Sequence, residues 1–314
     1  GYDIASMRHR MHARPLLVFA SGQPDMVDVV RTLLELGADP NDVNDKENIT
    51  ALMEACYIGG IDVVKALVES GAKHDAVDWL GNTVYMYAGS GGDISVVEYL
   101  IDQFGPVVLQ TKNRMNLTLI DSAVFNNRRP LVKFLLEEKN ASLTSFTLLF
   151  AAPHEWMNLF DAALAATESI DYEYINETAL LRAARADKQK AAKWLLEHGA
   201  RKHLNEAHDE FAARGNKEMV KLMLAVYDAK SVGRISEKYP LQLAVEKDNK
   251  ELIEILIEHK ASCDCSCVVS LINVGRCDVV RRVLSYNETC LSQYIGDNRM
   301  TLLDSAVAIA DEDC

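Results

Sequence analysis

The sequence predicts an all-α solenoid of about nine to ten helix-turn-helix units, some of them degenerate. Two observations lead to this fold class. Thr, a large apolar residue two positions on and Ala five positions on recur along the chain, and an apolar segment of helical pattern follows. In that second segment Val29, Val63, Val96 and Leu131 are separated by 34, 33 and 35 residues. A fixed period in this range indicates a stacked array, in which each unit completes its core with its neighbours.

The first helix of each unit is expected at the Thr motif. Leu52 and Ala55 lie three residues apart on one helix face, and the small Ala lets neighbouring helices approach closely. Thr50 is placed to cap this helix. The same pattern recurs at Thr83/Tyr85/Ala88, Thr118/Ile120/Ala123, Thr178/Leu180/Ala183 and Thr301/Leu303/Ala306, and with Tyr in place of Thr at Tyr239/Leu241/Ala244.

The second helix is expected where apolar residues form a stripe at helical spacing, as Val63, Val64 and Leu67 do. Gly71 follows in the position of a left-handed C-cap. Comparable segments begin near Val29, Val96, Leu131, Ala191, Met219, Leu252 and Val279.

At these residues the chain resembles the ankyrin repeat family, whose motif appears in the Thr-x-Leu-x-x-Ala cores and in GADPN at 37–41. The resemblance covers roughly residues 13 to 310. We therefore predict an N-terminal extension or cap at 1–12 and a repeat array at 13–314. A degenerate unit is expected near 142–172, a shortened connector without a finger near 261–275, and an incomplete last unit after which the natural protein continues.

Composition limits the classes of partner and compartment. The net charge of −13 argues against non-specific binding to nucleic acid or anionic membranes, and favours a basic or neutral partner. Seven cysteines, four of them within 263–277, do not form an evenly spaced disulfide framework, which suggests a reducing compartment. We expect an intracellular protein in the cytoplasm, with the nucleus as an alternative. The sequence has no run of 18 apolar residues that would span a membrane.

Two short motifs could suggest a ligand site. GSGGD at 89–93 loosely resembles a phosphate-binding loop, but it lacks the Lys-Ser/Thr pair and no strand precedes it, so we expect a turn between two helices. CDCSC at 263–267 offers thiolates, but zinc ligands are usually spaced more widely. We expect small thiols, buried or half-exposed, in a shortened connector.

The histidines do not form a catalytic constellation. His198, His203 and His208 recur every five residues, which is not one helix face, so they are expected on a polar loop and a helix surface. No Ser/His/Asp or Cys/His arrangement has a context that supports catalysis. The sequence therefore predicts no enzymatic activity, no cofactor and no metal site.

The family resemblance implies a curved stack whose concave side, formed by fingers and first helices, usually binds other proteins. Matching finger positions are Lys46, Glu47 and Ile49; Trp79, Leu80 and Asn82; Arg114, Met115 and Leu117; and Tyr174, Ile175 and Glu177. Matching first-helix positions include Glu54, Tyr57, Tyr87, Ser90, Ser122, Phe125, Arg182, Arg185, Leu243 and Glu246.

From these positions we predict a partner-binding set made up of Glu54, Tyr57, Trp79, Leu80, Asn82, Tyr87, Arg114, Met115 and Arg182. Trp79 is the key residue, because exposed Trp and Tyr clusters are typical binding anchors. The alternative is that Trp79 packs along the fingers and that Tyr87 fills space beside Tyr85. The acidic finger with Asp39, Asp42, Asp45 and Glu47 either attracts a basic peptide or simply keeps an exposed edge solvated.

The predicted function is a non-enzymatic scaffold that binds a protein or peptide through the concave groove. One alternative is an array that senses a nucleotide or small ligand, with Trp79, Tyr87, Arg114 and Arg182 supplying stacking and phosphate contacts. Another is a recruitment arm of a larger enzyme or channel.

Overall fold

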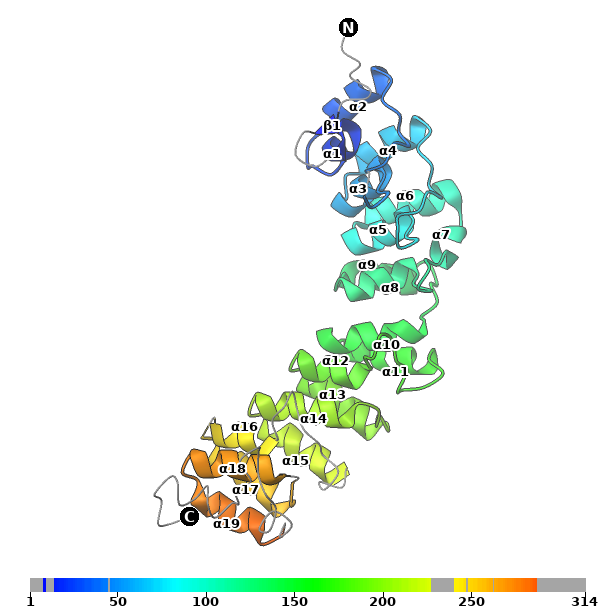
Figure 1. Ribbon diagram of the computed structural model, residues 1–314. Helices are drawn as coiled ribbons and strands as arrows, with labels where there is room; N and C mark the ends of the chain where they lie inside the picture. The colour runs from blue at the N-terminus through cyan, green and yellow to red at the C-terminus, as the bar shows by residue number, and fades with distance from the viewer. Residues whose placement is uncertain are drawn as a thin grey trace. The chain divides into compact units, whose positions relative to one another are not determined.

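The computed structural model describes residues 8–9, 14–44, 46–226, 240–246, 248–261 and 263–286 (Figure 1). Among these residues no helix has the length and apolar composition that crossing a membrane requires. The Thr motif at 301–306, Asp45, Tyr239, Cys290, Cys314 and most of the predicted extension at 1–12 lie outside them.

The described residues are mainly helical, as the sequence predicts. A short antiparallel ribbon joins β1 (Arg8–His9) to β2 (Arg14–Pro15). The first helices of successive units are α1 (Leu16–Ser21), α3 (Ala51–Ile58), α5 (Val84–Gly91), α8 (Leu119–Phe125), α10 (Ser145–Ala151), α12 (Ala179–Arg185), α14 (Leu204–Ala213), α16 (Pro240–Glu246) and α18 (Cys265–Asn273). The second helices are α2 (Val27–Glu35), α4 (Ile61–Glu69), α6 (Ile94–Phe104), α9 (Arg129–Glu137), α11 (Met157–Ala165), α13 (Gln189–Glu197), α15 (Lys217–Val226), α17 (Lys250–Glu258) and α19 (Cys277–Leu284).

Contacts between helices follow the order of the repeats. Most first helices pack on their own second helix, for example α3 on α4 and α12 on α13. First helices also pack on first helices, in the series α1, α3, α5, α8 and α10, and again in the series α12, α14, α16 and α18 (Figure 1). The short helix α7 (Val107–Gln110) and the 3-10 turn η2 (Ala152–His154) are additions to this plan. The all-α ankyrin-type solenoid is confirmed, since every unit buries its apolar stripe against a neighbour.

The chain divides into two compact parts, each containing several repeats, and these parts are called unit 1 and unit 2 from here on. Unit 1 comprises Gly1–Ala151 and Leu159–Thr167, and unit 2 comprises Ala152–Asn158 and Glu168–Cys314. The boundary runs through the segment 142–172, where the repeat motif is weakest and where α10, η2 and α11 form.

Threonine caps several first helices, which confirms the predicted role of the motif. The hydroxyl oxygen of Thr50 accepts the Met53 N–H at 3.2 Å, and that of Thr178 accepts the Leu181 N–H at 3.3 Å. In α8 the cap depends on Asp121, whose carboxylate accepts both the N–H and the hydroxyl of Thr118, at 2.9 and 2.8 Å. Each arrangement satisfies a backbone N–H that the first helical turn leaves unpaired.

The GSGGD segment is mostly helix, so the prediction of a turn is wrong for its first three residues. Gly89 and Gly91 belong to α5, and only Gly92, at a φ of 85°, is the left-handed residue that ends the helix. A Cβ on Gly89 would lie 2.4 Å from the carbonyl oxygen of Leu119, and one on Gly91 would lie 2.5 Å from that of Tyr57. These glycines are needed because neighbouring first helices approach α5 too closely for a side chain.

The cysteine-rich segment differs from its prediction. Cys263 and Cys267 form a disulfide across the start of α18, and Cys265 and Cys277 are also disulfide-bonded. The expectation that these residues are unbonded thiols is therefore wrong. Cys263 lies just before α18 and Cys267 in its first turn, so a separation of 4 residues along the chain brings their Cα atoms to 5.3 Å.

The prediction that the histidines lie on a polar surface is wrong for His208. Its side chain is 2% exposed, and its Nδ1 lies 3.2 Å from Asp209 Oδ1. The end of α12 has a hydrogen bond from the Lys188 N–H to the Ala183 carbonyl, and the end of α14 has the same bond from the Asn216 N–H to the Phe211 carbonyl. These two bonds align the two repeats. His208 therefore occupies the core position that Leu180 fills in the preceding repeat.

Candidate functional site

The finger tips are built by one Asn or Asp side chain in each of three successive repeats. In each case the side-chain Oδ1 accepts two backbone N–H groups of its own hairpin, at 2.8 to 3.1 Å. The three residues are Asn44, Asp78 and Asn113. Such bonds fix the backbone of a short turn without a long strand pair.

Asp78 is the charged member of this set and is 3% exposed. Its Oδ2 accepts the side-chain N–H of Asn82 at 2.9 Å and the hydroxyl of Tyr87 at 3.0 Å. Burial raises the pKa of Tyr87, and the charge and hydrogen bond of Asp78 raise it further. Tyr87 therefore stays protonated and donates to Asp78. This hydrogen bond connects the finger to helix α5.

Trp79 lies at the tip of this finger and is 57% exposed. Its backbone is held by both neighbouring fingers. The N–H of Trp79 donates to the carbonyl of Glu47 at 3.0 Å, and its carbonyl accepts Nη1 of Arg114 at 2.8 Å. The indole is thus presented on a backbone that is bonded to both neighbouring fingers.

Further apolar side chains of unit 1 are exposed on the first helices. Tyr57 on α3 is 46% exposed, and Phe125 on α8 is 50% exposed. Each lies two residues before the left-handed residue that ends its helix, which makes the two positions equivalent in their repeats. By the same comparison Glu54 on α3 is the counterpart of Tyr87 on α5.

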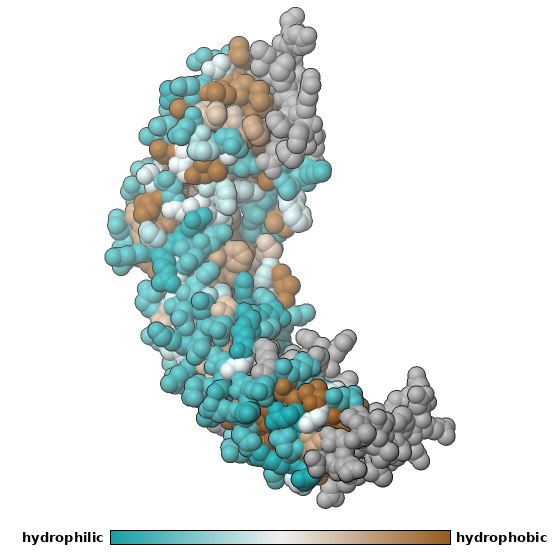
Figure 2. Space-filling model, turned by 90° about the vertical axis from the view of Figure 1, so that its left-hand side faces the viewer, coloured by the Kyte–Doolittle hydropathy of each residue, from teal (hydrophilic) through white to brown (hydrophobic). Residues whose placement is uncertain are grey.

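The other predicted residues of unit 1 belong to the fingers. Asn82 is half-buried. It extends the hydrogen bonds of Asp78 to the next finger, because its Oδ1 accepts Nδ2 of Asn113 at 2.7 Å. Leu80 and Met115 are half-buried, and Arg114 is exposed. On the face drawn in Figure 2, hydrophobic surface forms separate patches among hydrophilic residues.

Arg182 belongs to unit 2 and lies in a different environment from the other eight predicted residues. Its Nε is 3.4 Å from Glu177 Oε2, and burial lowers its pKa. Arg185 pairs with the same Glu177, and its Nε lies 3.6 Å from Glu210 Oε1.

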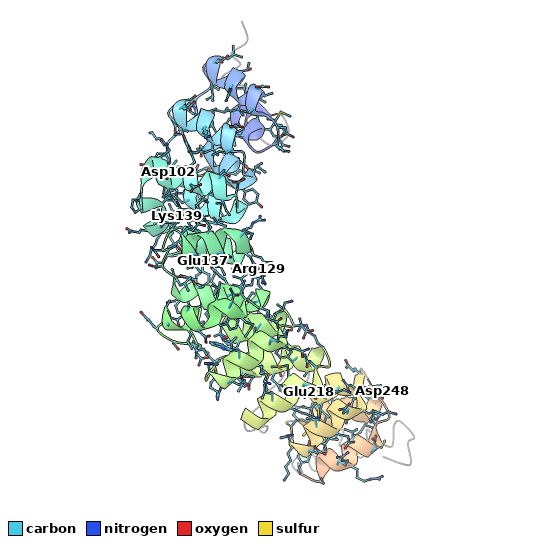
Figure 3. All side chains as sticks on the ribbon, turned by 180° about the vertical axis from the view of Figure 1, so that it is seen from behind. Asp102, Arg129, Glu137, Lys139, Glu218 and Asp248 are labelled. Carbon is cyan, nitrogen blue, oxygen red and sulfur yellow. A yellow bond between two sulfur atoms is a disulfide. The ribbon has the colours of Figure 1, made fainter. Side chains whose placement is uncertain are left out.

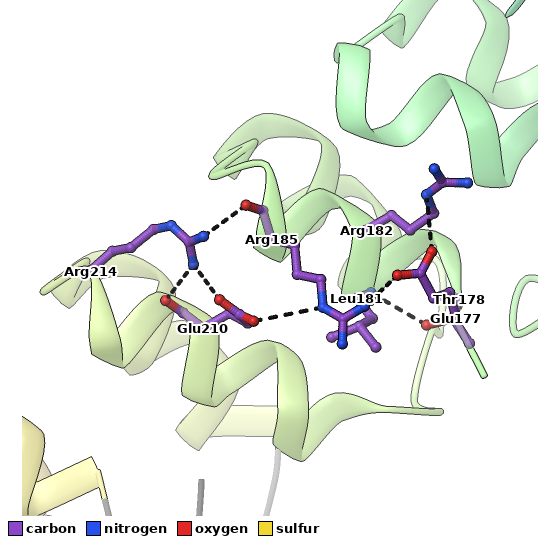
Figure 4. Close-up of polar contacts among 7 residues, drawn as sticks. All are labelled: Glu177, Thr178, Leu181, Arg182, Arg185, Glu210 and Arg214. Atoms are coloured by element: carbon purple, nitrogen blue, oxygen red, sulfur yellow. Dashed lines mark hydrogen bonds and ion pairs between the residues drawn. The ribbon is translucent and has the colours of Figure 1, made fainter. Parts of the chain in front are cut away.

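Arg214 extends this chain of contacts (Figure 4). Its Nη1 donates to Glu210 Oε2 at 2.6 Å, and its Nη2 donates to the backbone carbonyl of Arg185 at 2.7 Å. The equivalent face of unit 2 is thus occupied by charges that already pair with each other.

Charged residues also lie on the second helices. Asp102 on α6, and Arg129 and Glu137 on α9, are exposed and are labelled in Figure 3. They belong to the helices opposite the first-helix positions named above. They therefore provide reference positions for changes of charge outside the predicted surface.

Within the described ranges, no three or more His, Cys, Asp or Glu side chains are grouped so as to hold a metal ion. Sequence reasoning missed Asp78 and its counterparts Asn44 and Asn113. Their signal was present, because they repeat at 34 and 35 residues and precede the capping Thr by five or six positions.

Comparison with known proteins identifies the class of fold. A family model described as ankyrin repeats in three copies matches residues 16–112. Ankyrin repeat domain-containing protein 63 of Homo sapiens is 34% identical over 138 residues, which cover 42% of this chain and 36% of that protein. Ankyrin repeat and KH domain-containing protein mask-1 of Caenorhabditis elegans is 27% identical over 227 residues, which cover 67% of this chain and 8% of that protein. A putative ankyrin repeat protein of Rickettsia bellii is 30% identical over 118 residues, which cover 37% of this chain and 63% of that protein.

Residues 16–112 belong to the ankyrin repeat family, and the aligned part of the chain spans about a third of the length of the human relative. Ankyrin repeats generally mediate protein–protein interaction and are typically not enzymes.

Proposed function

We propose that this chain is a non-enzymatic scaffold that binds a partner protein through the finger and first-helix surface of unit 1. The observation that carries this proposal is Trp79, exposed on a finger whose backbone bonds to both neighbours. A large aromatic side chain on a rigid backbone buries much area on binding and loses little conformational entropy.

The two units differ in what they offer a partner. In unit 1, Tyr57, Trp79 and Phe125 expose apolar area that binding would remove from water. In unit 2, Arg185 and Glu210 pair with each other, and a partner would have to replace those contacts. The apolar surface of unit 1 is therefore the better binding surface.

The proposal is tested by capture from a cell lysate treated with nuclease. Trp79→Ala with Tyr57→Ala is expected to weaken capture of the partner by at least about 30-fold, because each change removes a hot-spot side chain. Tyr57 is a better second site than Tyr87, since loss of Tyr87 would disturb the finger itself.

The matched control changes two exposed apolar residues of unit 2, Ile175→Ala with Val274→Ala. This control should retain the partner, and both double variants should keep the helical circular dichroism of the parent. Equal capture by the parent and by the variant of Trp79 and Tyr57 would disprove the proposed surface.

A further inference from the structure

The surface around Trp79 combines aromatic rings with carboxylates from adjacent repeats. Glu54 and Tyr57 are three residues apart on α3 and share one helix face. Glu54 is the counterpart of Tyr87, so the two lie side by side on α3 and α5, which pack together. The backbone bond from Trp79 to Glu47 joins the tip of one finger to the acidic end of the previous finger.

Three carboxylates act on the Tyr87 hydroxyl at this surface. After burial, the charges of Asp78, Glu54 and Glu47 raise the pKa of Tyr87. The Asp78 carboxylate is enclosed by its four donors. Glu47 and Glu54 are half-buried, and Oε2 of Glu47 accepts Nδ2 of Asn44 at 3.1 Å.

Positive charges come from the fingers on both sides of Trp79. Lys46 is exposed and directly precedes Glu47. Arg114 comes from the following finger, and its Nη1 is bonded to the Trp79 carbonyl.

We propose that the surface formed by Glu47, Glu54, Tyr57 and Trp79 binds a basic segment of the partner protein, with an Arg or Lys side chain over an aromatic ring and its charge directed at the two carboxylates. This inference rests on the proposed function and specifies the chemistry of the partner. A guanidinium or ammonium group is attracted both to the face of Trp or Tyr and to carboxylates. The net charge of the chain, −13, favours the approach of a basic segment.

The test is a selection of random peptides displayed on phage. The purified chain is the target, and peptides that also bind the Trp79→Ala, Tyr57→Ala variant are removed. We expect the enriched peptides to carry a net positive charge, with Arg or Lys beside an apolar residue. Enrichment of neutral or acidic peptides would overturn the basic-segment inference and leave the proposed surface standing. If no peptide distinguishes the parent from the variant, the proposed surface fails as well.

A second readout measures the affinity of an enriched peptide by fluorescence anisotropy. Glu47→Gln with Glu54→Gln is expected to lower the affinity about 10-fold, and less at high salt, because the lost attraction is electrostatic. The control, Asp102→Asn with Glu137→Gln, removes the same charge from the second helices (Figure 3) and should change the affinity less than about twofold. An equal effect of the two double variants would show general attraction by net charge and overturn the site.

Discussion

The hydrogen bond from Tyr87 to Asp78 should contribute measurably to the stability of unit 1. Tyr87→Phe removes one of the four donors to a carboxylate that is 3% exposed, and it keeps the ring. A hydrogen bond to a charged group contributes about 1.5 to 3 kcal/mol, so we expect the free energy of unfolding to fall by that amount. The two backbone donors, Leu80 N–H and Asn82 N–H, remain, and the finger should still form.

The assay is urea unfolding followed by circular dichroism, with Tyr57→Phe as the matched control. Tyr57 is 46% exposed, so its variant should stay within about 0.5 kcal/mol of the parent. A Tyr87→Phe variant as stable as this control would refute the argument. A double-mutant cycle with Asp78→Ala gives the pairwise term directly, and a coupling near zero would show that the hydroxyl does not bond to Asp78.

Three further predictions concern packing, pH and the disulfide. Gly89→Ala should lower the melting temperature, because its Cβ would lie 2.4 Å from the Leu119 carbonyl and overpacking costs about 1 to 3 kcal/mol, more than the roughly 1 kcal/mol that Ala gains in helix propensity. Burial raises the pKa of Asp121, so between the carboxylate's unfolded pKa, near 4, and the higher folded pKa the folded state binds more protons. The parent should therefore gain stability relative to Asp121→Asn as pH falls from 7 towards 4.5 in urea unfolding, and a relative loss would contradict the sign. Loss of the Cys263–Cys267 disulfide in Cys263→Ser with Cys267→Ser should cost about 2 kcal/mol, as the chain-entropy model gives for so short a loop. Without reductant, hydrogen exchange in α18 should be faster in this variant than in the parent, and equal exchange would contradict the prediction.

The repeat plan could be predicted from the sequence because its determinants are local and periodic. The Thr cap, the large apolar residue and the Ala of a first helix lie within six residues, and each has one structural role. Thr50, Leu52 and Ala55 are all buried in the structure, as the motif requires. The apolar stripe of the second helix is also local and periodic, so the helix positions follow directly from the pattern.

What could not be predicted depends on contacts between repeats. Gly89 looks like a turn residue in isolation, and only the close carbonyl of Leu119 on the next first helix explains why a glycine is needed within α5. His208 looks like a surface residue until the helix ends are aligned and it falls on the core position of Leu180. At each of these positions the residue's role depends on how closely a neighbouring repeat approaches, and the sequence does not give that distance.

The candidate surface shows the same division. Exposure of Tyr57 and Trp79 could be expected from their positions in the repeat, but the role of Tyr87 could not. The hydroxyl of Tyr87 is directed at Asp78, a residue that the motif does not mark, so Tyr87 supports the finger rather than offering its polar group to a partner. Arg182 was assigned to the same surface on its repeat position alone, and its pairing with Glu177 in unit 2 sets it apart.

Equivalent repeat positions therefore serve different purposes in the two units. The position that is Tyr57 on α3 and Phe125 on α8 becomes Arg185 on α12, where it pairs with Glu177 and Glu210. An apolar side chain at this position gains by leaving water, whereas a paired charge loses its partners when a ligand displaces them. Replacing Arg185 by Tyr would leave the Glu177 carboxylate with one cation fewer and should destabilise α12, while adding aromatic surface to unit 2. The test adds Arg185→Tyr to the Trp79→Ala, Tyr57→Ala variant and compares capture by this triple variant with capture by the parent. Equal capture would show that binding depends on exposed aromatic area alone. The carboxylates near Trp79 would then have no part in binding.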